Sequence, residues 1–396
     1  MNILFLLKNI SVGGVEVVTS VLANKFVEEN HHVVIWAFYK GEVTSDDRLD
    51  NRIKIVYGSG FTASKENAES LLNTLRDNRI DVVINQWALP PQTTSLLKKV
   101  LKQYYVRIIS VHHSDPMTNG RLQNIDTALL NTQNPIIHKA LKLKRKLYKM
   151  ITSYSMRRSY QTCDEFVVLA DSYKKHLTDF IGIESPNHLV SIANPITIDK
   201  NEQLSLNDKE KRLLYVGRLE NENKKPERAL IIWENLSKQF QDWQLDIVGD
   251  GPDRARLEKW VSEHCLPQVN FYGYQKPSSF YQRASMLLLT SDFEGFPLVL
   301  TEAMSFGVIP VAYGSFSAVY DIIEDGKDGL IIPKTKEGFN AAVMAERMAA
   351  VMTDKCRLEQ MALAAIGKSK NYSIDKIYQQ WMGVMKRIQL NSAEHN

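Results

Sequence analysis

Short apolar runs alternate with longer stretches of helical periodicity along most of the chain. Strands are predicted at residues 3–7, 32–38, 53–56, 81–85, 106–111, 165–169 and 189–192, and again at 213–216, 245–248, 269–272, 286–289, 308–312 and 330–332. Helical patterns lie between them, for example at 15–29, 65–78 and 92–103. Buried strands that alternate with helices are typical of parallel sheets with helices on both faces. The pattern therefore predicts an α/β protein.

The alternation is interrupted once, by a polar stretch at 199–211 that follows the turn-forming pair Asn194-Pro195. We therefore expect two Rossmann-like, doubly wound parallel-sheet domains facing a cleft, at residues 1–195 and 196–373. Beyond Ser373, residues 374–396 carry apolar positions at helical spacing and predict a final helix. Ligands of such sheets bind at the carboxyl ends of the strands, so polar residues directly after strands are the candidates for a site.

Size and composition agree with this division. The 396 residues suffice for two domains, and 44% hydrophobic with 24% charged residues is typical of a soluble globular protein. The N-terminal apolar run has no basic segment before it and is interpreted as a strand rather than a signal peptide. Three scattered cysteines, Cys163, Cys265 and Cys356, argue against a disulfide framework or a zinc site and favour a cytoplasmic protein.

One segment is strongly basic. No Asp or Glu occurs from Thr127 to Cys163, whereas eight Lys and Arg residues lie between Lys139 and Arg158, interleaved with apolar positions. A solvated surface helix would account for this pattern. Attachment to an anionic membrane surface would account for it equally well, and would make the protein peripheral on the inner face of the cytoplasmic membrane. The surroundings match no nucleic-acid-binding module, so no nucleic-acid partner is expected.

The most informative motif is Asp292-Phe-Glu294-Gly295-Phe296-Pro297-Leu298-Val299-Leu-Thr-Glu302. It follows an apolar strand and enters a short helix that Gly307 ends. With Pro297 at the first helical position, the amides of Leu298 and Val299 have no partner within the helix and suit a phosphate. Glu302, one turn further, suits the vicinal hydroxyls of a ribose, and Glu294 a second polyol. The alternative is two solvated glutamates. The motif favours a nucleotide sugar.

Other candidates also follow predicted strands. Gly13 and Gly14 open the first helix, but they do not form the G-x-G-x-x-G dinucleotide motif. Arg218 ends a strand with Lys224 and Lys225 a few residues on, a set suited to a diphosphate. The remaining candidates are His112 and His113, Gly249, and Tyr272 with Gly273.

Taken in this order, the motifs resemble those of the retaining nucleotide-sugar glycosyltransferases of family 4, which have the two-domain GT-B architecture. The resemblance implies that Arg218 and Lys225 neutralise the leaving diphosphate, with Lys224 the alternative to Lys225. It implies that Glu302 holds the ribose and Glu294 the donor hexose. His112, more than His113, would contact the donor sugar.

The resemblance also assigns the glycines and the last helix. Gly13 and Gly14 would lie over the donor phosphates, Gly249 at the nucleotide, and Tyr272 and Gly273 at the base. The helix at 374–396 would pack back on the first domain. Asp321 departs from the family pattern, where a glutamate is common.

The sequence thus predicts a retaining, hexosyltransferase-type enzyme that uses a nucleotide diphosphate donor, UDP favoured, and a saccharide acceptor, lipid-linked in our preferred setting of capsule or O-antigen assembly. No metal and no cofactor beyond the donor are expected, because no D-x-D motif is present. Two alternatives remain open: an epimerase of GT-B fold that converts the nucleotide sugar alone, and a non-catalytic subunit that binds it.

Overall fold

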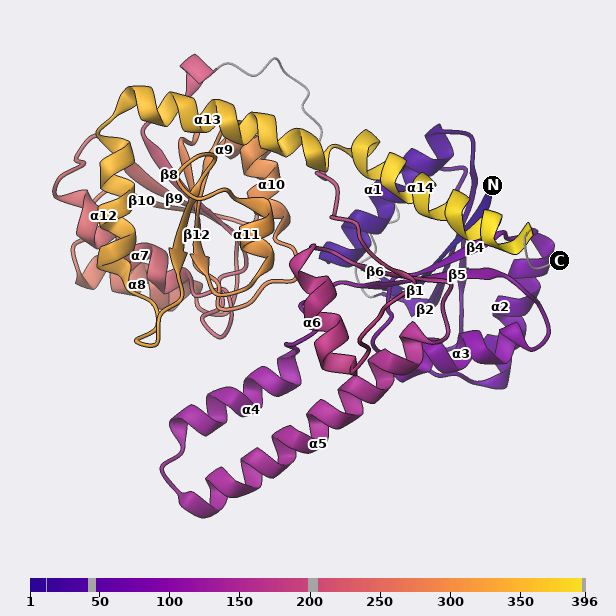
Figure 1. The fold of residues 1–396 in the computed structure, drawn as a ribbon. Helices are drawn as coiled ribbons and strands as arrows, with labels where there is room; N and C mark the ends of the chain where they lie inside the picture. The colour runs from indigo at the N-terminus through magenta and orange to yellow at the C-terminus, as the bar shows by residue number, and fades with distance from the viewer. Residues whose placement is uncertain (12, 42–47, 199–205, 394–396) are drawn as a thin grey trace. The chain divides into compact units, whose positions relative to one another are not determined.

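The computed structural model describes residues 1–11, 13–41, 48–198 and 206–393 (Figure 1). Residues 199–205, within the predicted polar connection, lie outside the described residues. The chain divides into two compact units. Unit 1 comprises Met1–Pro195 and Ile374–Asn396, and unit 2 comprises Ile196–Ser373.

Unit 1 contains a seven-stranded sheet in the order β3-β2-β1-β4-β5-β6-β7, with every neighbouring pair parallel. The strands are β1 Asn2–Ile10, β2 His32–Lys40, β3 Lys54–Tyr57, β4 Val82–Asn85, β5 Arg107–His112, β6 Glu165–Val168 and β7 Leu189–Ser191. The central strands are buried on both faces, which explains why they form continuous apolar runs in the sequence. The order reverses between β1 and β4.

Unit 1 also contains helices. They are α1 Gly14–Glu28, α2 Lys65–Asp77, α3 Pro91–Leu101, α4 Gly120–Asn131, α5 Pro135–Tyr160, α6 Ser172–Ile181 and α14 Ile374–Ala393. Helix α14 packs on α1, where the Tyr378 hydroxyl and the His31 Nε2 atom are 3.0 Å apart and the Tyr378 ring lies edge-on to Phe26. Arg387 forms an ion pair with the buried Glu165. The final helix is therefore part of unit 1.

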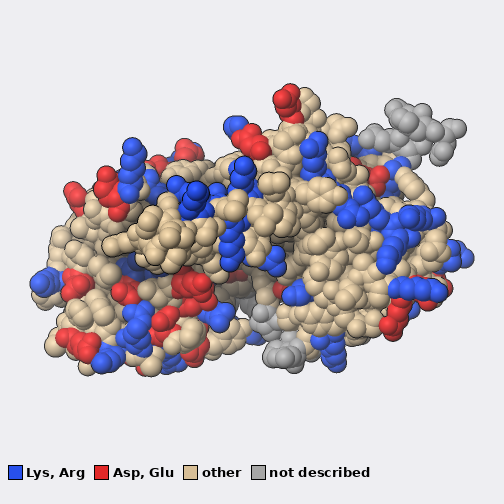
Figure 2. Space-filling view, turned by 90° about the horizontal axis from the view of Figure 1, so that it is seen from below, with Lys and Arg blue, Asp and Glu red and all other residues tan. Residues whose placement is uncertain are grey.

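Helices α4 and α5 form an antiparallel hairpin that projects from the sheet of unit 1 (Figure 1). Figure 2 views the side toward which the hairpin projects in Figure 1, and both basic and acidic side chains are interspersed there with uncharged surface. The C-terminal part of α5 fastens the hairpin to the unit, because the Ser155 hydroxyl donates to the Leu89 carbonyl at 2.7 Å and the Ser153 hydroxyl to the Phe180 carbonyl at 2.7 Å.

Unit 2 repeats the plan with a six-stranded parallel sheet in the order β10-β9-β8-β11-β12-β13. The strands are β8 Arg212–Val216, β9 Gln244–Val248, β10 Val269–Gly273, β11 Met286–Leu289, β12 Ile309–Gly314 and β13 Leu330–Pro333. The helices are α7 Pro226–Ser237, α8 Arg254–Glu263, α9 Ser278–Arg283, α10 Leu298–Ser305, α11 Ala318–Ile322, α12 Ala341–Met352 and α13 Lys355–Ser369. The order reverses between β8 and β11.

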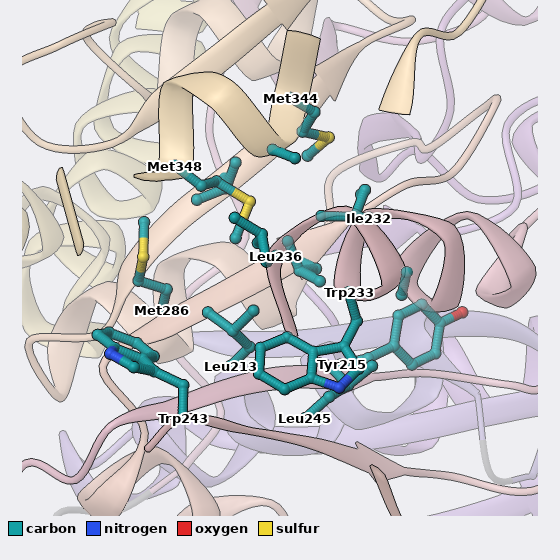
Figure 3. Packing of buried hydrophobic residues seen from close by; sticks show 14 of the residues in the cluster. Leu213, Tyr215, Ile232, Trp233, Leu236, Trp243, Leu245, Met286, Met344 and Met348 are labelled. Carbon is teal, nitrogen blue, oxygen red and sulfur yellow. The ribbon is translucent and has the colours of Figure 1, made fainter. Parts of the chain in front are cut away.

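The core of unit 2 lies between the sheet and the helices α7 and α12 (Figure 3). Trp233 is fully buried there, and its indole N–H donates to the Pro267 carbonyl at 2.8 Å, so the one polar atom of the side chain is satisfied. Met344 and Met348 of α12 belong to the same buried cluster. All thirteen predicted strands are present and both sheets are doubly wound, so the predicted fold class is confirmed.

Candidate functional site

In unit 2, the loops that follow β8 and β11 are tied to each other at the point where the strand order reverses. The Asp292 N–H donates to the Asn223 carbonyl at 2.9 Å, and the Thr290 hydroxyl donates to the Lys225 carbonyl at 3.0 Å. Ligands of doubly wound sheets bind outside the carboxyl ends of the strands at such a reversal. The two loops carry most of the charged residues that the sequence singled out.

Three of these residues are cations with different surroundings. The Lys224 Nζ atom lies 2.7 Å from Oε1 of Glu294, and the Lys225 Nζ atom lies 3.6 Å from Oδ2 of Asp292. The Arg218 side chain is 67% exposed, and its Nε atom lies 3.5 Å from a Glu220 carboxylate oxygen. Arg218 therefore has the guanidinium that is most accessible to an incoming anion, while Lys224 is already engaged by the glutamate of the motif.

A fourth cation, Arg228, was missed by the sequence analysis. It projects from the first turn of α7, and its Nη1 atom lies 2.6 Å from Oδ1 of Asp292 and donates to the Thr290 carbonyl at 2.8 Å. Its guanidinium also lies over the Phe339 ring, 4.6 Å from the ring centroid. Arg228 thus orients Asp292 and fixes the loop after β11. Its helical position resembles any other surface position, so no sequence signal marks it.

The glycines after β8 and β9 serve backbone packing. Gly249 has a φ of +145°, and a Cβ atom there would overlap the Gly217 carbonyl oxygen. The Leu219 N–H donates to the Asp250 carbonyl at 2.9 Å, which holds the two loops together. Gly249 therefore lets the two loops approach closely. A role of Gly249 in contacting a nucleotide stays a prediction.

Tyr272 and Gly273 end the edge strand β10. The Tyr272 hydroxyl lies 3.3 Å from Oδ1 of Asp246, and its ring packs edge-on against Phe280. Gly273 has a φ of +70°, and its carbonyl accepts from the Gly249 N–H at 2.8 Å. The Tyr272 side chain is engaged with the sheet. A nucleotide base at this position would therefore be contacted by the backbone.

Helix α10 begins at Leu298, and Pro297 is its N-cap residue, with a φ of −74° and a ψ of 100°. The prediction that Pro297 occupies the first helical position is therefore wrong by one residue, because its extended ψ places it before the helix. The first turn starts with the amides of Leu298 and Val299, which have no partner within the helix. Both amides still fit the anion site that the motif predicts.

The helix ends as expected, with Gly307 at a φ of +72° just beyond its C-cap residue, Phe306. Phe296, before the helix, is buried, with its ring centroid 5.8 Å from that of Tyr372. This packing holds the Gly295-Phe296-Pro297 turn against the rest of the unit.

Glu294 and Glu302 are both buried, so the alternative of two solvated glutamates is wrong. Burial raises the pKa of Glu302, while hydrogen bonds from two hydroxyl groups lower it. The Thr197 hydroxyl donates to Oε1 at 2.5 Å and the Tyr281 hydroxyl to Oε2 at 3.4 Å. Each carboxylate oxygen has a second lone pair, so the group can still accept hydrogen bonds from a diol.

In unit 1, the first helix starts at the predicted glycines. Gly13 is the N-cap residue of α1 and Gly14 its first residue. The Glu16 carboxylate folds back against Gly13, where a Cβ atom would overlap its Oε2 atom. Burial raises the pKa of Glu16, partly opposed by the charge of Lys8. A side chain at Gly13 would therefore displace Glu16.

His112 is the last residue of β5, and His113 is the first residue after the strand. His112 is buried and its Nε2 atom lies 3.1 Å from the Ser114 hydroxyl, while the His113 Nε2 atom lies 2.6 Å from Oε1 of Gln86. Burial lowers the pKa of His112 to about 4, so its imidazole is neutral at pH 7. Burial, together with His112, also lowers the pKa of His113. Neither ring carries a positive charge, so each can form a hydrogen bond with a substrate but not an ion pair.

Beside this pair lie two polar groups that the sequence analysis missed. Among the described residues, the Gln86 Nε2 and Trp87 Nε1 atoms are buried and donate to no partner. The Lys8 ammonium lies over the Trp87 ring at 5.6 Å from its centroid. Buried donors are nearly always satisfied in proteins, so a bound ligand or water is expected here. No sequence pattern identifies such unsatisfied atoms.

Comparison with known families identifies both units. The model for glycosyl transferases group 1 matches residues 197–368, and the model for Glycosyltransferase Family 4 matches residues 12–200. The chain belongs to the family 4 glycosyltransferases. Membership carries the GT-B architecture and the retaining class of this family, as the motif resemblance implied.

Curated relatives include two bacterial sugar transferases. The glycosyltransferase is 25% identical over 394 residues to the GalNAc-alpha-(1->4)-GalNAc-alpha-(1->3)-diNAcBac-PP-undecaprenol alpha-1,4-N-acetyl-D-galactosaminyltransferase of Campylobacter jejuni, covering 98% of this chain and 99% of that protein. It is 38% identical over 128 residues to the lipopolysaccharide 1,6-galactosyltransferase of Salmonella typhimurium, covering 31% of this chain and 35% of that protein.

Solved structures share the fold of this glycosyltransferase. The apo lipopolysaccharide outer core galactosyltransferase WaaB superimposes with a TM-score of 0.68 at 20% identity, covering 98% of this chain and 99% of that one. HepE of Anabaena in complex with UDP gives a TM-score of 0.72 at 15% identity, covering 98% and 100%.

Within the ranges that the structure describes, no helix combines the length and the apolarity needed to cross a bilayer. Within the same ranges, no three His, Cys, Asp or Glu side chains are placed together as ligands for a metal ion.

Proposed function

We propose that this glycosyltransferase moves a hexosyl unit from a UDP-sugar to a saccharide acceptor carried on a lipid, in the assembly of an envelope polysaccharide such as capsule or O-antigen. The observation that carries the proposal is the set of cations around the reversal point of the unit 2 sheet: Arg218, Lys224, Lys225 and Arg228 lie on the loops or helix that follow β8, close to the loop that precedes α10. Lys224 and Arg228 hold Glu294 and Asp292 in place, and Arg218 and Lys225 are the cations that we assign to the diphosphate.

Stabilisation of the leaving diphosphate is the main chemical task. As the bond between the sugar C1 atom and the diphosphate oxygen breaks, negative charge grows on that oxygen. Arg218, Lys225 and the amides of Leu298 and Val299 would bind this charge. The acceptor hydroxyl oxygen forms the new bond to C1 on the same face, and its proton passes to the departing diphosphate. No carboxylate nucleophile is required for this route.

Three further side chains orient the donor in this proposal. Glu302, already bonded to Thr197, would accept from the ribose hydroxyls. Glu294, held by Lys224 at 2.7 Å, would accept from the hexose hydroxyls. His112 would hydrogen-bond to the sugar as a neutral imidazole, consistent with its lowered pKa of about 4.

The unsatisfied Gln86 and Trp87 donors of unit 1 support an acceptor site there, since a saccharide offers hydroxyl acceptors to both. The Campylobacter jejuni relative is named for an undecaprenol-linked saccharide, which supports the choice of a lipid-linked acceptor. The UDP held by HepE supports UDP as the donor nucleotide. A donor of this kind is a cytoplasmic metabolite, so we place the reaction in the cytoplasm.

The first test is calorimetry with UDP, GDP, ADP and dTDP in the presence of EDTA, on the wild type and on Glu302→Ala. We expect UDP to bind without metal and the variant to lose at least tenfold in affinity. Binding that appears only after Mg²⁺ is added would contradict the metal-independent proposal. Binding of a different nucleotide would support the proposed site but would change the proposed donor from a UDP-sugar to a sugar of that nucleotide.

The second test separates transfer from conversion of the donor. With UDP-sugar and a lipid-linked saccharide, product analysis should show an extended saccharide with the α-linkage of a retained centre. Donor that isomerises in the absence of acceptor would favour the epimerase alternative. Binding without any turnover, across a panel of UDP-sugars and saccharides, would favour the non-catalytic subunit.

A further inference from the structure

The hairpin of α4 and α5 carries apolar residues on two opposite faces of α5, and only one of these faces is covered. On the covered face, Leu141, Tyr148 and Thr152 are half-buried and Met156 is buried. Arg145 lies on this same face and forms an ion pair with Asp126 of α4, with Nη2 and Oδ2 3.0 Å apart. This face therefore accounts for the packing of the hairpin.

The second face of α5 is in solvent. Seven large apolar residues of α5 are between 49% and 78% exposed, and all of them except Ile137 lie on this second face. They are Ile136, Ile137, Leu143, Leu147, Met150, Ile151 and Tyr154. These are seven of the fourteen exposed large hydrophobic residues in the described part of the chain, so half of them lie on one helix. Single exposed apolar residues need no explanation, but a concentration of this kind marks an interaction site.

Most of these residues form one continuous stripe. At about 100° per residue, Ile136, Leu143, Leu147, Met150, Ile151 and Tyr154 fall within an arc of about 100°. We call this set the outer stripe. The side chain of Asn134 accepts from the Ile136 and Ile137 amides at 2.9 and 3.3 Å, so the helix is capped where the stripe begins.

Lysines border the outer stripe on both sides. Lys139, Lys142 and Lys146 lie on one flank, and Lys144 lies on the other, all of them exposed. No acidic residue occurs from Thr127 to Cys163. An apolar stripe between two cationic flanks matches the layered chemistry of a lipid surface, where an acyl region lies beneath anionic headgroups.

We propose that α5 lies in the plane of an anionic lipid bilayer surface, with the outer stripe inserted at the boundary of the acyl region and the flanking lysines at the headgroups. A second copy of this chain is opposed by charge, because pairing two outer stripes would bring the lysine flanks of both copies together. The long lysine stems can lie along the inserted surface while their ammonium groups stay in water.

This arrangement goes beyond the proposed transfer reaction and does not depend on the donor. It brings the enzyme to the surface in which a lipid-linked acceptor would reside. Binding then draws on two contributions, apolar burial and charge attraction, and each can be removed separately on this helix.

Co-sedimentation of the full chain with vesicles tests the proposal. We expect binding to vesicles of 70% phosphatidylcholine and 30% phosphatidylglycerol, and little to phosphatidylcholine alone. Leu143→Ser/Leu147→Ser/Met150→Ser should weaken binding on the order of a hundredfold or more, because three inserted side chains are lost. Lys139→Gln/Lys142→Gln/Lys146→Gln should weaken it by roughly fivefold for each lysine. Val343→Ser/Leu363→Ser, two exposed apolar positions of unit 2, is the matched control and should bind as the wild type does.

A fluorescent probe distinguishes insertion from adsorption by charge. In a Cys265→Ser/Cys356→Ser background, an environment-sensitive dye on Leu147→Cys should shift to shorter wavelength with the mixed vesicles, and one on Leu363→Cys should not shift. Binding of the wild type without a shift at position 147 would overturn insertion. Equal binding by the serine variant, or no binding at all, would overturn the proposal.

Two controls keep the outcomes separate. Sedimentation equilibrium without lipid should show the wild type as a monomer, and a dimer that the serine variant lacks would assign the outer stripe to self-association instead. UDP binding by the serine variant should equal that of the wild type, which shows that the fold is intact. A failure of membrane binding with UDP binding preserved would therefore leave the proposed function standing.

Discussion

The Thr197 hydroxyl donates to the Glu302 carboxylate at 2.5 Å, joining the first residues of unit 2 to the middle of α10. The glutamate is buried, and this bond is the largest of the contributions that lower its pKa against the effect of burial. The bond therefore helps to keep Glu302 ionised and holds its carboxylate in one orientation. A residue at the beginning of the unit thus supports the group that we assign to the ribose.

Thr197→Val should weaken UDP binding by about fivefold to tenfold, because a hydrogen bond to a charged group contributes about 1.5–3 kcal/mol and part of it is retained through Tyr281. Without the bond the pKa of Glu302 rises further, so the loss should be larger at pH 5.5 than at pH 8. Calorimetry at both pH values measures this. Thr74→Val, a buried threonine of unit 1, is the control. An equal loss of UDP affinity at both pH values would show that Thr197 orients Glu302 without affecting its ionisation.

Arg218→Ala should reduce kcat/KM by two orders of magnitude or more, since a fixed donor at a developing charge contributes about 3–4 kcal/mol. Its melting temperature should stay within a degree or two of the wild type, because the side chain is 67% exposed. Steady-state kinetics and a thermal melt measure the two effects. Arg256→Ala in α8 is the control and should retain activity. A near-normal rate in Arg218→Ala would remove the diphosphate assignment.

Substitution of Lys224 and substitution of Lys225 should have different kinetic effects. Lys225→Ala should lower kcat and UDP affinity, because we place its ammonium at the diphosphate. Lys224→Ala should mainly raise KM for the UDP-sugar and leave UDP affinity nearly unchanged, because it removes the partner that holds Glu294 at 2.7 Å. A double-mutant cycle of Lys224→Ala and Glu294→Gln should then show strong coupling. The reverse pattern would exchange the roles of the two lysines.

His113→Gln should change the pH dependence of stability. The pKa of His113 is lowered to about 3 in the folded state by burial and by His112, from 6.5 in the unfolded chain. Between these values the unfolded state binds one more proton, so this residue makes stability fall as pH falls, by about 1.4 kcal/mol per pH unit. Urea unfolding at pH 5 and pH 7 should show a smaller slope in the variant, because the buried His112 still contributes its own. An identical slope in wild type and variant would contradict a buried, neutral His113.

The sequence predicted the strands well because each is a short apolar run buried on both faces, a signal that does not depend on partners far along the chain. Residues that directly follow strands could be placed for the same reason. The orientation of Arg228 could not, since it depends on where Asp292 lies. The link of Thr197 to Glu302 spans more than a hundred residues and leaves no local trace.

Helix α5 shows the same limit in another form. The sequence showed the basic charge and the apolar positions of α5. Because the apolar positions fall on two faces of the helix, the sequence alone did not show which face is buried. Which of them packs on α4 is decided by the partner helix, through contacts such as that of Arg145 with Asp126. The one-residue shift of Pro297 has a smaller cause, because a proline fits both the cap and the first helical position.

Helix α14 has a consequence for the order in which the protein is made. It packs on α1, with Tyr378 against Phe26 and Asp375 paired with Lys25 at 2.7 Å. The ribosome therefore completes all of unit 2 before unit 1 receives its last helix. Until then α1 presents an uncovered apolar side, and a nascent chain that stalls before Ile374 would be a substrate for chaperones.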